Sequence, residues 1–150
     1  MAQQRRVHEK PIVYRRARAR GELTLARATL RAIRAHAVRK GDPIAIGEVA
    51  GLLAIKRTHE LIPHCHPIPV TGSRVTIRPT ARGLRADSEV EALWRTGVEM
   101  EALTAVAVAL LTAWDMVKYL EKNDRGAYPT TRLGGIRVVS KEKRALRNPA

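Results

Sequence analysis

The chain has 150 residues, of which 45% are hydrophobic, with one cysteine, no phenylalanine and a formal net charge of +14. One cysteine excludes an internal disulfide framework, and we find neither a signal peptide nor a run approaching the roughly 20 apolar residues of a membrane span. We therefore expect one soluble, cytoplasmic domain over residues 1–150, with residues 1–10 and 142–150 as loose tails.

The first half of the chain predicts a strand followed by two helices. Arginine alternates with small or apolar residues over 12–23, which is typical of an exposed strand. Thr24 is a candidate N-cap for a helix whose apolar residues recur at helical spacing up to Ala37. A second helix is expected over 44–57, with small residues such as Gly51 allowing close packing, and the proline-flanked segment 63–69 is expected to be a loop.

The second half predicts a hairpin, a long helix and a last strand. Strands over 68–78 and 84–94 are joined by a turn that contains Gly83. The helix over 98–122 is apolar almost all round in its middle, and Thr96 and Glu99 have capping-box spacing at its start. With a strand over 131–140, the order is a split β-α-β-β-α-β unit with one extra helix. We therefore expect an α+β, ferredoxin-like antiparallel sheet with its helices packed on one face.

The segment HELIPHCHPIPV, residues 59–70, gathers three histidines and the cysteine. Adjacent side chains of an extended loop point to opposite sides, so only His64 and His66 could share a metal ion, and the chain offers no second cluster of ligands. This argues against a metal site. Cys65 could be a nucleophile, but a buried, inert cysteine is the more common case.

The long helix carries acids at both ends. Glu99 and Glu101 lie in its first turn, and Asp115 precedes Lys118 by three residues, as a surface ion pair would. Asp115 follows an almost wholly apolar stretch, where an unpartnered acid is costly. At 1.5 Å per residue, Glu101 and Asp115 are about 21 Å apart, so they cannot act on one reacting centre within one subunit. If both are functional, this hints at an oligomer.

Several cations flank these segments. Lys56 and Arg57 come shortly before the proline loop, where they either complement the helix dipole or bind a phosphate chain. Lys141 follows the last strand. The overall surplus of 28 Lys and Arg over 14 Asp and Glu favours a polyanionic partner, although a merely solvated, arginine-rich surface has the same composition.

Three segments together resemble one family: KGDPIAIGEVAGLLAIKRTHELIPHCHPIPV, TGVEMEALTAVAVALLTAWDMVK and IRVVSK. They are similar to the molybdenum-cofactor biosynthesis protein C family, the cyclic pyranopterin monophosphate synthases, from about Lys10 to Lys141. The loop YLEKNDRGAYPTTR resembles archaeal members. The resemblance implies a lyase that converts (8S)-3',8-cyclo-7,8-dihydroguanosine 5'-triphosphate to cyclic pyranopterin monophosphate and releases pyrophosphate. It also implies a ferredoxin-like fold and a hexamer, a trimer of dimers, with sites at subunit interfaces.

The resemblance also assigns residues. Asp115 and Lys118 match the catalytic pair, with Asp115 as the acid/base, and no metal site or tightly bound cofactor is implied, although Mg²⁺ could accompany the triphosphate. The positions that match the substrate-binding segments are His64, Cys65, His66, Met100, Glu101, Glu99, Lys56 and Lys141.

Some positions depart from the family pattern, and two other functions stay open. Arg6 stands where an acid is usual, His59 where a small or aromatic residue is usual, and the tail EKRALRNPA differs from the usual glycine-rich one.

A nucleic-acid-binding module would need aromatic residues on its central strands, and Trp94 alone stands there, which argues against nucleic acid. An assembly scaffold would not depend on Asp115 or Lys118.

Overall fold

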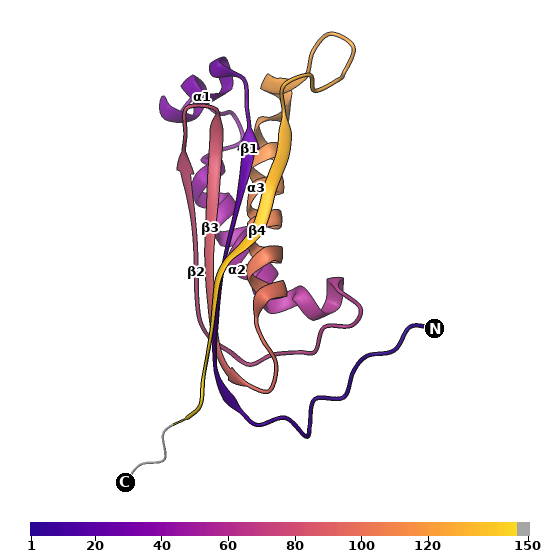
Figure 1. Ribbon diagram of the computed structural model, residues 1–150. Helices are drawn as coiled ribbons and strands as arrows, with labels where there is room; N and C mark the ends of the chain where they lie inside the picture. Colours follow the sequence, from indigo (N-terminus) through magenta and orange to yellow (C-terminus); the bar gives the residue numbers. More distant parts are fainter. Residues whose placement is uncertain (147–150) are drawn as a thin grey trace.

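The computed structural model describes residues 1–146, as a four-stranded antiparallel sheet with three helices (Figure 1). The sheet has the strand order β2-β3-β1-β4, so the first and last strands of the chain lie next to each other. This arrangement confirms the predicted α+β architecture, and the short α1 is the extra helix. The elements are β1 (Val13–Thr24), α1 (Arg27–Arg34), α2 (Pro43–Leu61), β2 (Val70–Pro79), β3 (Gly83–Trp94), α3 (Glu99–Glu121) and β4 (Arg132–Arg144).

The alternation along β1 divides the sheet into two faces. Ala17, Ala19 and Leu23 are buried on the face that α2 and α3 cover, whereas Arg18 and Arg20 point to the opposite, open face. Successive side chains of a strand point to opposite sides, so the alternation of arginine and alanine along β1 gives each face of the sheet one kind of side chain. The core lies between the sheet and α3, whose Ala105, Ala109 and other inward residues are fully buried.

The two long helices approach each other and the sheet at glycine positions. A β-carbon on Gly47 would lie 2.9 Å from the carbonyl oxygen of Ala109, and one on Gly51 would lie 3.1 Å from that of Ala105. A β-carbon on Gly21 of β1 would lie 2.7 Å from Val106 of α3. A side chain at any of these positions would require its neighbour to move, so the glycines allow α3 to pack closely against α2 and β1. The close packing expected of Gly51 is confirmed.

Two of the predicted N-caps are wrong. The N-cap of α1 is Ala26, and that of α3 is Val98, and neither helix has a side-chain cap from Thr24 or Thr96. At α1 the carboxylate of Glu121 takes over this role, since its oxygens accept hydrogen bonds from the Ala26 backbone N–H at 3.1 and 3.2 Å. The cap comes from the far end of α3, so no local sequence pattern could indicate it.

Other boundaries extend beyond the predicted ranges. α2 begins behind Asp42, whose Oδ1 accepts from the Ile44 N–H at 2.9 Å, and it continues four residues past Arg57. Lys56 therefore lies on the last full turns of α2 and not at its terminus. β4 extends through Arg144 because its last residues pair with the start of β1, so residues 142–144 are not a loose tail. Residues 147–150 of that predicted tail lie outside the described residues.

The segment before β1 has no helix or strand, but side chains hold it in place. The Gln4 Nε2 donates to the carbonyl oxygen of Cys65 at 2.8 Å, and the Arg95 Nη1 donates to that of Lys10 at 2.6 Å. Residues 1–10 are thus tied at both ends of the segment, in contrast to the loose tail expected.

By length and composition, α3 is a candidate membrane span, contrary to the expectation that no segment approaches one. Half of its most apolar 18-residue window is buried inside the fold. The central helix of a water-soluble protein meets the same criteria, and α3 occupies that position here, packed on the sheet with α2 beside it.

Candidate functional site

The predicted site residues fall into two groups at opposite ends of α3. One group lies around the loop between α2 and β2, and we call it the loop pocket. It is a hollow of about 140 Å³ lined by His64, Cys65, His66, Ile68, Thr96, Gly97, Glu99, Met100 and Glu101. The loop and the first turn of α3, separated by more than 30 residues in sequence, thus bring together six of the eight predicted substrate-binding residues.

The loop itself is held by backbone contacts. The Ile62 N–H donates to the Thr58 carbonyl at the end of α2, and the Cys65 N–H donates to the Ile62 carbonyl at 3.0 Å. Together with the flanking prolines and the Gln4 contact, these bonds fix the backbone of the loop. His64 is exposed, whereas Cys65 and His66 are partly buried and line the pocket.

Glu101 is the most unusual group of the loop pocket. Only 3% of the residue is exposed, and its Oε2 has no hydrogen-bond partner among the described residues. Burial, to which the charge of Glu99 adds, raises the pKa of the Glu101 carboxyl to about 7. At neutral pH this group therefore exchanges between a neutral form that can donate a hydrogen bond and a charged form that can only accept one.

Burial also raises the pKa of the Cys65 thiol, and the carboxyl of Glu101 adds to this effect. A thiol with a raised pKa stays protonated at neutral pH, and the thiolate is the reactive form. Cys65 thus does not have the properties of a nucleophile. Within residues 1–146 there is no group of three or more His, Cys, Asp or Glu side chains that could hold a metal ion.

Lys141 joins the loop pocket from the sheet. Its Nζ lies 3.5 Å from the Glu99 Oε1, because pairing with Ala17 turns Lys141 toward the helix side of β4. Together with Arg15, Lys143 and the N-terminus of α3, it lines a second hollow of about 160 Å³ that shares Gly97 and Glu99 with the loop pocket. This neighbouring hollow is cationic and can attract an anionic part of a ligand.

Lys56 lies apart from the loop pocket. It borders a separate hollow of about 390 Å³ beside the start of β2, and the two hollows have only Ile68 in common. The structure therefore does not bring Lys56 into contact with the other predicted substrate-binding residues within one chain.

The second group, which we call the Asp115 cluster, lies near the C-terminal end of α3. The Lys118 Nζ lies 2.8 Å from the Asp115 Oδ1, and the Lys40 Nζ lies 3.9 Å from its Oδ2 and 3.2 Å from its carbonyl oxygen. The Asp115 side chain is 61% exposed. The acid is thus solvated and paired, as the three-residue spacing of a surface ion pair predicted.

The charges of this cluster shift the pKa values of Asp115 and Lys118. The hydrogen bond from Lys118 and the charges of Lys118 and Lys40 lower the pKa of the Asp115 carboxyl, and Asp115 in turn raises the pKa of the Lys118 ammonium. At neutral pH the resting pair is therefore a carboxylate, able to accept a proton, beside an ammonium, able to donate one.

Comparison with known proteins identifies the family of this chain. The sequence profile of the MoaC family matches residues 5–144, which is nearly all of the chain. The chain belongs to the MoaC family. A relative from Thermococcus kodakarensis, named probable cyclic pyranopterin monophosphate synthase, is 51% identical over 137 residues, covering 91% of this chain and 88% of the relative. One of the same name from Sulfolobus acidocaldarius is 53% identical over 134 residues, covering 89% and 94%.

A third relative of this MoaC-family chain, from Methanothermobacter thermautotrophicus, carries a different name. It is called a probable cyclic pyranopterin monophosphate synthase accessory protein and is 46% identical over 140 residues, covering 93% of this chain and 88% of the relative. The resemblance drawn from the three sequence segments, including its archaeal character, is therefore confirmed.

The sequence analysis did not identify two residues of the candidate site. Lys40 was not considered, because only the folded contact between the turn after α1 and the end of α3 brings it to Asp115. Arg15 was seen only as part of an arginine-rich strand. Its position gives a signal that could have been used, since it has the same parity along β1 as the buried Val13 and Ala17.

We expect the charge on Glu101 to weaken the fold. A carboxyl whose pKa is higher in the folded than in the unfolded state binds its proton more tightly when folded, so its contribution to stability declines as pH rises from about 4.5 to 7. Glu101→Gln removes this titration. Between pH 5 and pH 8, the free energy of unfolding of the variant should therefore rise by about 2 to 3 kcal/mol relative to wild type. Urea unfolding of both proteins at the two pH values measures this change, and a constant difference would contradict it.

Proposed function

We propose that this chain converts (8S)-3',8-cyclo-7,8-dihydroguanosine 5'-triphosphate to cyclic pyranopterin monophosphate, with release of pyrophosphate. The observation that carries the proposal is the membership of the family together with the retained Asp115–Lys118 pair at 2.8 Å. The names of relatives about half identical to this chain support the substrate and the reaction. We further propose that the enzyme is soluble, acts in the cytoplasm and has no tightly bound cofactor.

The acid-base residues and the cations of the candidate site suit the two parts of this reaction, rearrangement of the ring and displacement of pyrophosphate. Opening the purine ring and closing the pterin ring require several proton transfers, for which Asp115 accepts and Lys118 donates. The Lys40 ammonium, 3.9 Å from the Asp115 Oδ2, is a second cation beside this carboxylate. Forming the cyclic phosphate displaces pyrophosphate, and cations such as Lys118 and Lys141 stabilise the charge on the phosphate oxygens. Mg²⁺ would enter, if required, as the counter-ion of the triphosphate.

The loop pocket supplies recognition in this proposal. His66 donates to a phosphate or relays a proton, and the buried carboxyl of Glu101 finds in the ligand the hydrogen-bond partner that its Oε2 lacks in the free chain. A guanosine-derived ring offers both donors and acceptors on its edge, so either protonation state of Glu101 can be satisfied.

We propose that a complete site forms only between subunits. Glu101 and Asp115 are 14 residues apart on one straight helix, which is about 21 Å, so one chain cannot place both on one substrate. The outer side of the helix layer supports this arrangement, because it exposes apolar residues that a second copy would cover. These residues are Ile46, Val49 and Leu53 of α2 and Leu111 of α3. A hexamer built as a trimer of dimers satisfies both requirements.

A coupled assay tests the reaction. The purified protein is incubated with GTP and the radical enzyme of the preceding step, and the oxidised pterin is detected by fluorescence and pyrophosphate by a colorimetric assay. We expect both products in equal amounts. Neither product, from a folded oligomer at high concentration, would show that the chain has kept the family fold for another role.

A further inference from the structure

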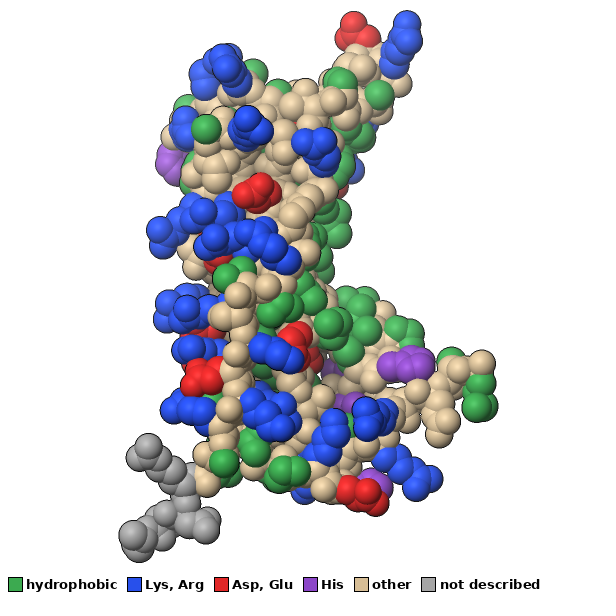
Figure 2. All heavy atoms as spheres, viewed as in Figure 1, with side chains coloured by type: hydrophobic (Ala, Val, Ile, Leu, Met, Phe, Trp, Pro, Cys, Tyr) green, Lys and Arg blue, Asp and Glu red, His purple; other side chains and the backbone are tan. Residues whose placement is uncertain are grey.

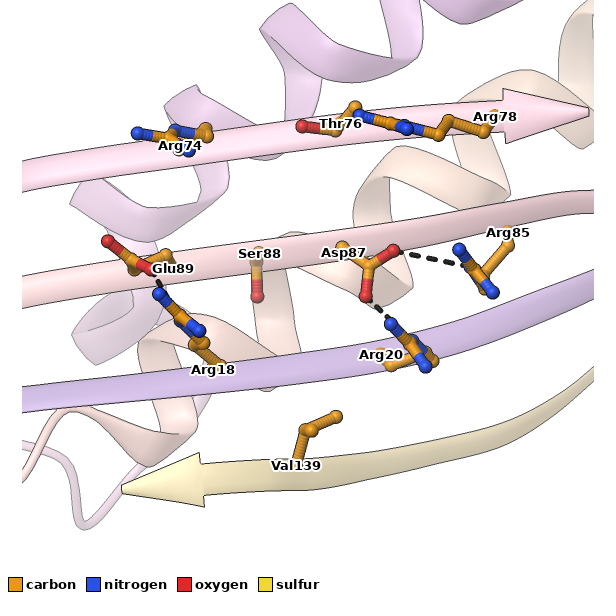
Figure 3. Close-up of a pocket in the computed structure, with 10 residues that line it drawn as sticks. All are labelled: Arg18, Arg20, Arg74, Thr76, Arg78, Arg85, Asp87, Ser88, Glu89 and Val139. Carbon is orange, nitrogen blue, oxygen red and sulfur yellow. Dashed lines mark hydrogen bonds and ion pairs between the residues drawn. The ribbon is translucent and has the colours of Figure 1, made fainter. Parts of the chain in front are cut away.

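The open face of the sheet carries a second concentration of charge, far from the helices. A hollow of about 380 Å³ crosses β1, β2 and β3 on this face and reaches Val139 of β4 (Figure 3). Figure 2 shows the corresponding column of Lys and Arg side chains along the left side of the view, over the strands of Figure 1. The charged residues that line the hollow are Arg18, Arg20, Arg74, Arg78, Arg85, Asp87 and Glu89.

The arginines of this hollow outnumber the acids that neutralise them. Glu89 pairs with Arg18 at 2.5 Å, and Asp87 is shared by Arg20 at 2.7 Å and Arg85 at 3.3 Å. Arg74 and Arg78 on β2 have no ion-pair partner among the described residues, and Figure 3 shows their side chains beside the paired ones. Five guanidinium groups against two carboxylates leave a formal charge of +3 within one hollow.

The pairing also positions the arginines. The carboxylates of β3 hold the guanidinium groups of Arg18 and Arg20 over the sheet. Arg74 and Arg78 lie on the neighbouring strand β2, on either side of Thr76 along the same face. Planar guanidinium groups bind phosphate oxygens through two parallel hydrogen bonds, and a concave site lined by one sign of charge concentrates counter-ions.

We propose that this hollow, which we call the open-face anion site, binds a chain of two or three phosphates between the free Arg74 and Arg78 and the paired Arg18, Arg20 and Arg85. Such a chain carries three to four negative charges, about equal to the excess of the site. The phosphate chain can be inorganic pyrophosphate or part of a nucleoside triphosphate. The open-face anion site lies on the sheet face opposite the helices and does not depend on the proposed function.

The composition of the face favours a short phosphate chain over single-stranded nucleic acid. Tyr14, the aromatic residue on this side of β1, donates a hydrogen bond from its hydroxyl to Glu91 at 2.8 Å, and the guanidinium carbon of Arg144 lies 4.4 Å from the centroid of its ring. Its ring is therefore not free to stack on a base, and stacking supplies much of the affinity for single strands.

Isothermal titration of the full-length protein with sodium pyrophosphate tests the proposal. The variant is Arg74→Ala/Arg78→Ala, and the matched control is Arg27→Ala/Arg31→Ala, which removes two exposed arginines from α1. We expect the first variant to weaken binding to the open-face anion site by about tenfold or more and the control to leave it unchanged. A second class of pyrophosphate sites, abolished by Lys118→Ala, would belong to the proposed active site, so failures of the two proposals are distinguishable.

Titration with GTP identifies the source of the phosphate chain. Comparable affinities for GTP and pyrophosphate would show that the phosphates alone are recognised, and tighter binding of GTP would show that a nucleotide is the ligand; the proposal holds in both cases. Binding of pyrophosphate that is equal in wild type and the Arg74→Ala/Arg78→Ala variant would overturn it. So would binding of a single-stranded RNA to this face that pyrophosphate does not displace.

Discussion

Replacing Asp115 by asparagine is expected to lower turnover by about 100- to 10,000-fold, the range that general acid-base groups contribute. The amide cannot accept a proton, yet it has the same shape and can still contact Lys118. Since Asp115 is exposed, the melting temperature and the oligomeric state should not change. Asp124→Asn removes an exposed carboxylate from the nearby loop and serves as the matched control, with unchanged turnover.

A substitution of Lys118 tests the same catalytic pair from its other member. Lys118→Arg keeps a cation beside Asp115, but a guanidinium does not give up its proton in the accessible pH range. We expect this variant to bind the triphosphate with nearly unchanged affinity and to lose turnover to an extent similar to that of Asp115→Asn. Near-normal turnover in either variant would remove that residue from the catalytic pair.

Glu121→Ala is expected to cost about 3 to 5 kcal/mol in the free energy of unfolding, the largest effect on stability that we predict. The carboxylate is 7% exposed and accepts hydrogen bonds from the Ala26 N–H and from the hydroxyls of Thr29 and Thr131, the last at 2.6 Å. It thereby connects α3 to the start of α1 and to the residue before β4. Alanine would leave two buried hydroxyl groups and one partly buried backbone N–H without this acceptor.

Urea unfolding at one fixed protein concentration measures this cost, because association contributes to apparent stability. Glu121→Gln retains one acceptor oxygen and should lose roughly half as much. Glu60→Ala, an exposed acid on α2, is the matched control and should change stability by less than about 0.5 kcal/mol. A loss of the same small size for Glu121→Ala would contradict the account of this contact.

The sequence was most informative for features that depend on a single strand or helix. The alternation over 12–23 predicted the strand β1, and the rise per residue of the long helix predicted the separation of Glu101 from Asp115. Local patterns could not predict contacts between distant elements. The cap of α1 comes from Glu121, 95 residues away from Ala26, and the partner of Asp115 that was missed, Lys40, is 75 residues away from it.

The same limit applies to the chemistry of the site. The motif around His64, Cys65 and His66 was recognised from the sequence, whereas the raised pKa values of Cys65 and Glu101 follow from burial between the loop and α3. For Asp115, the three-residue spacing from Lys118 predicted the surface ion pair, whereas the apolar stretch before it gave no information about its exposure. Burial of a charged group depends on which side of a helix it occupies relative to the other elements.

The central claim is that each site combines the loop pocket of one subunit with the Asp115 cluster of another. It is tested by mixing two inactive variants, Asp115→Asn and Glu101→Ala, after dissociation and reassembly, and measuring turnover in the coupled assay. If sites are shared, random pairing of the two variants leaves about a quarter of the sites with both residues intact, so about a quarter of the wild-type turnover should return. If each site belongs to one chain, every site stays defective, and turnover at the level of the separate variants would contradict the account.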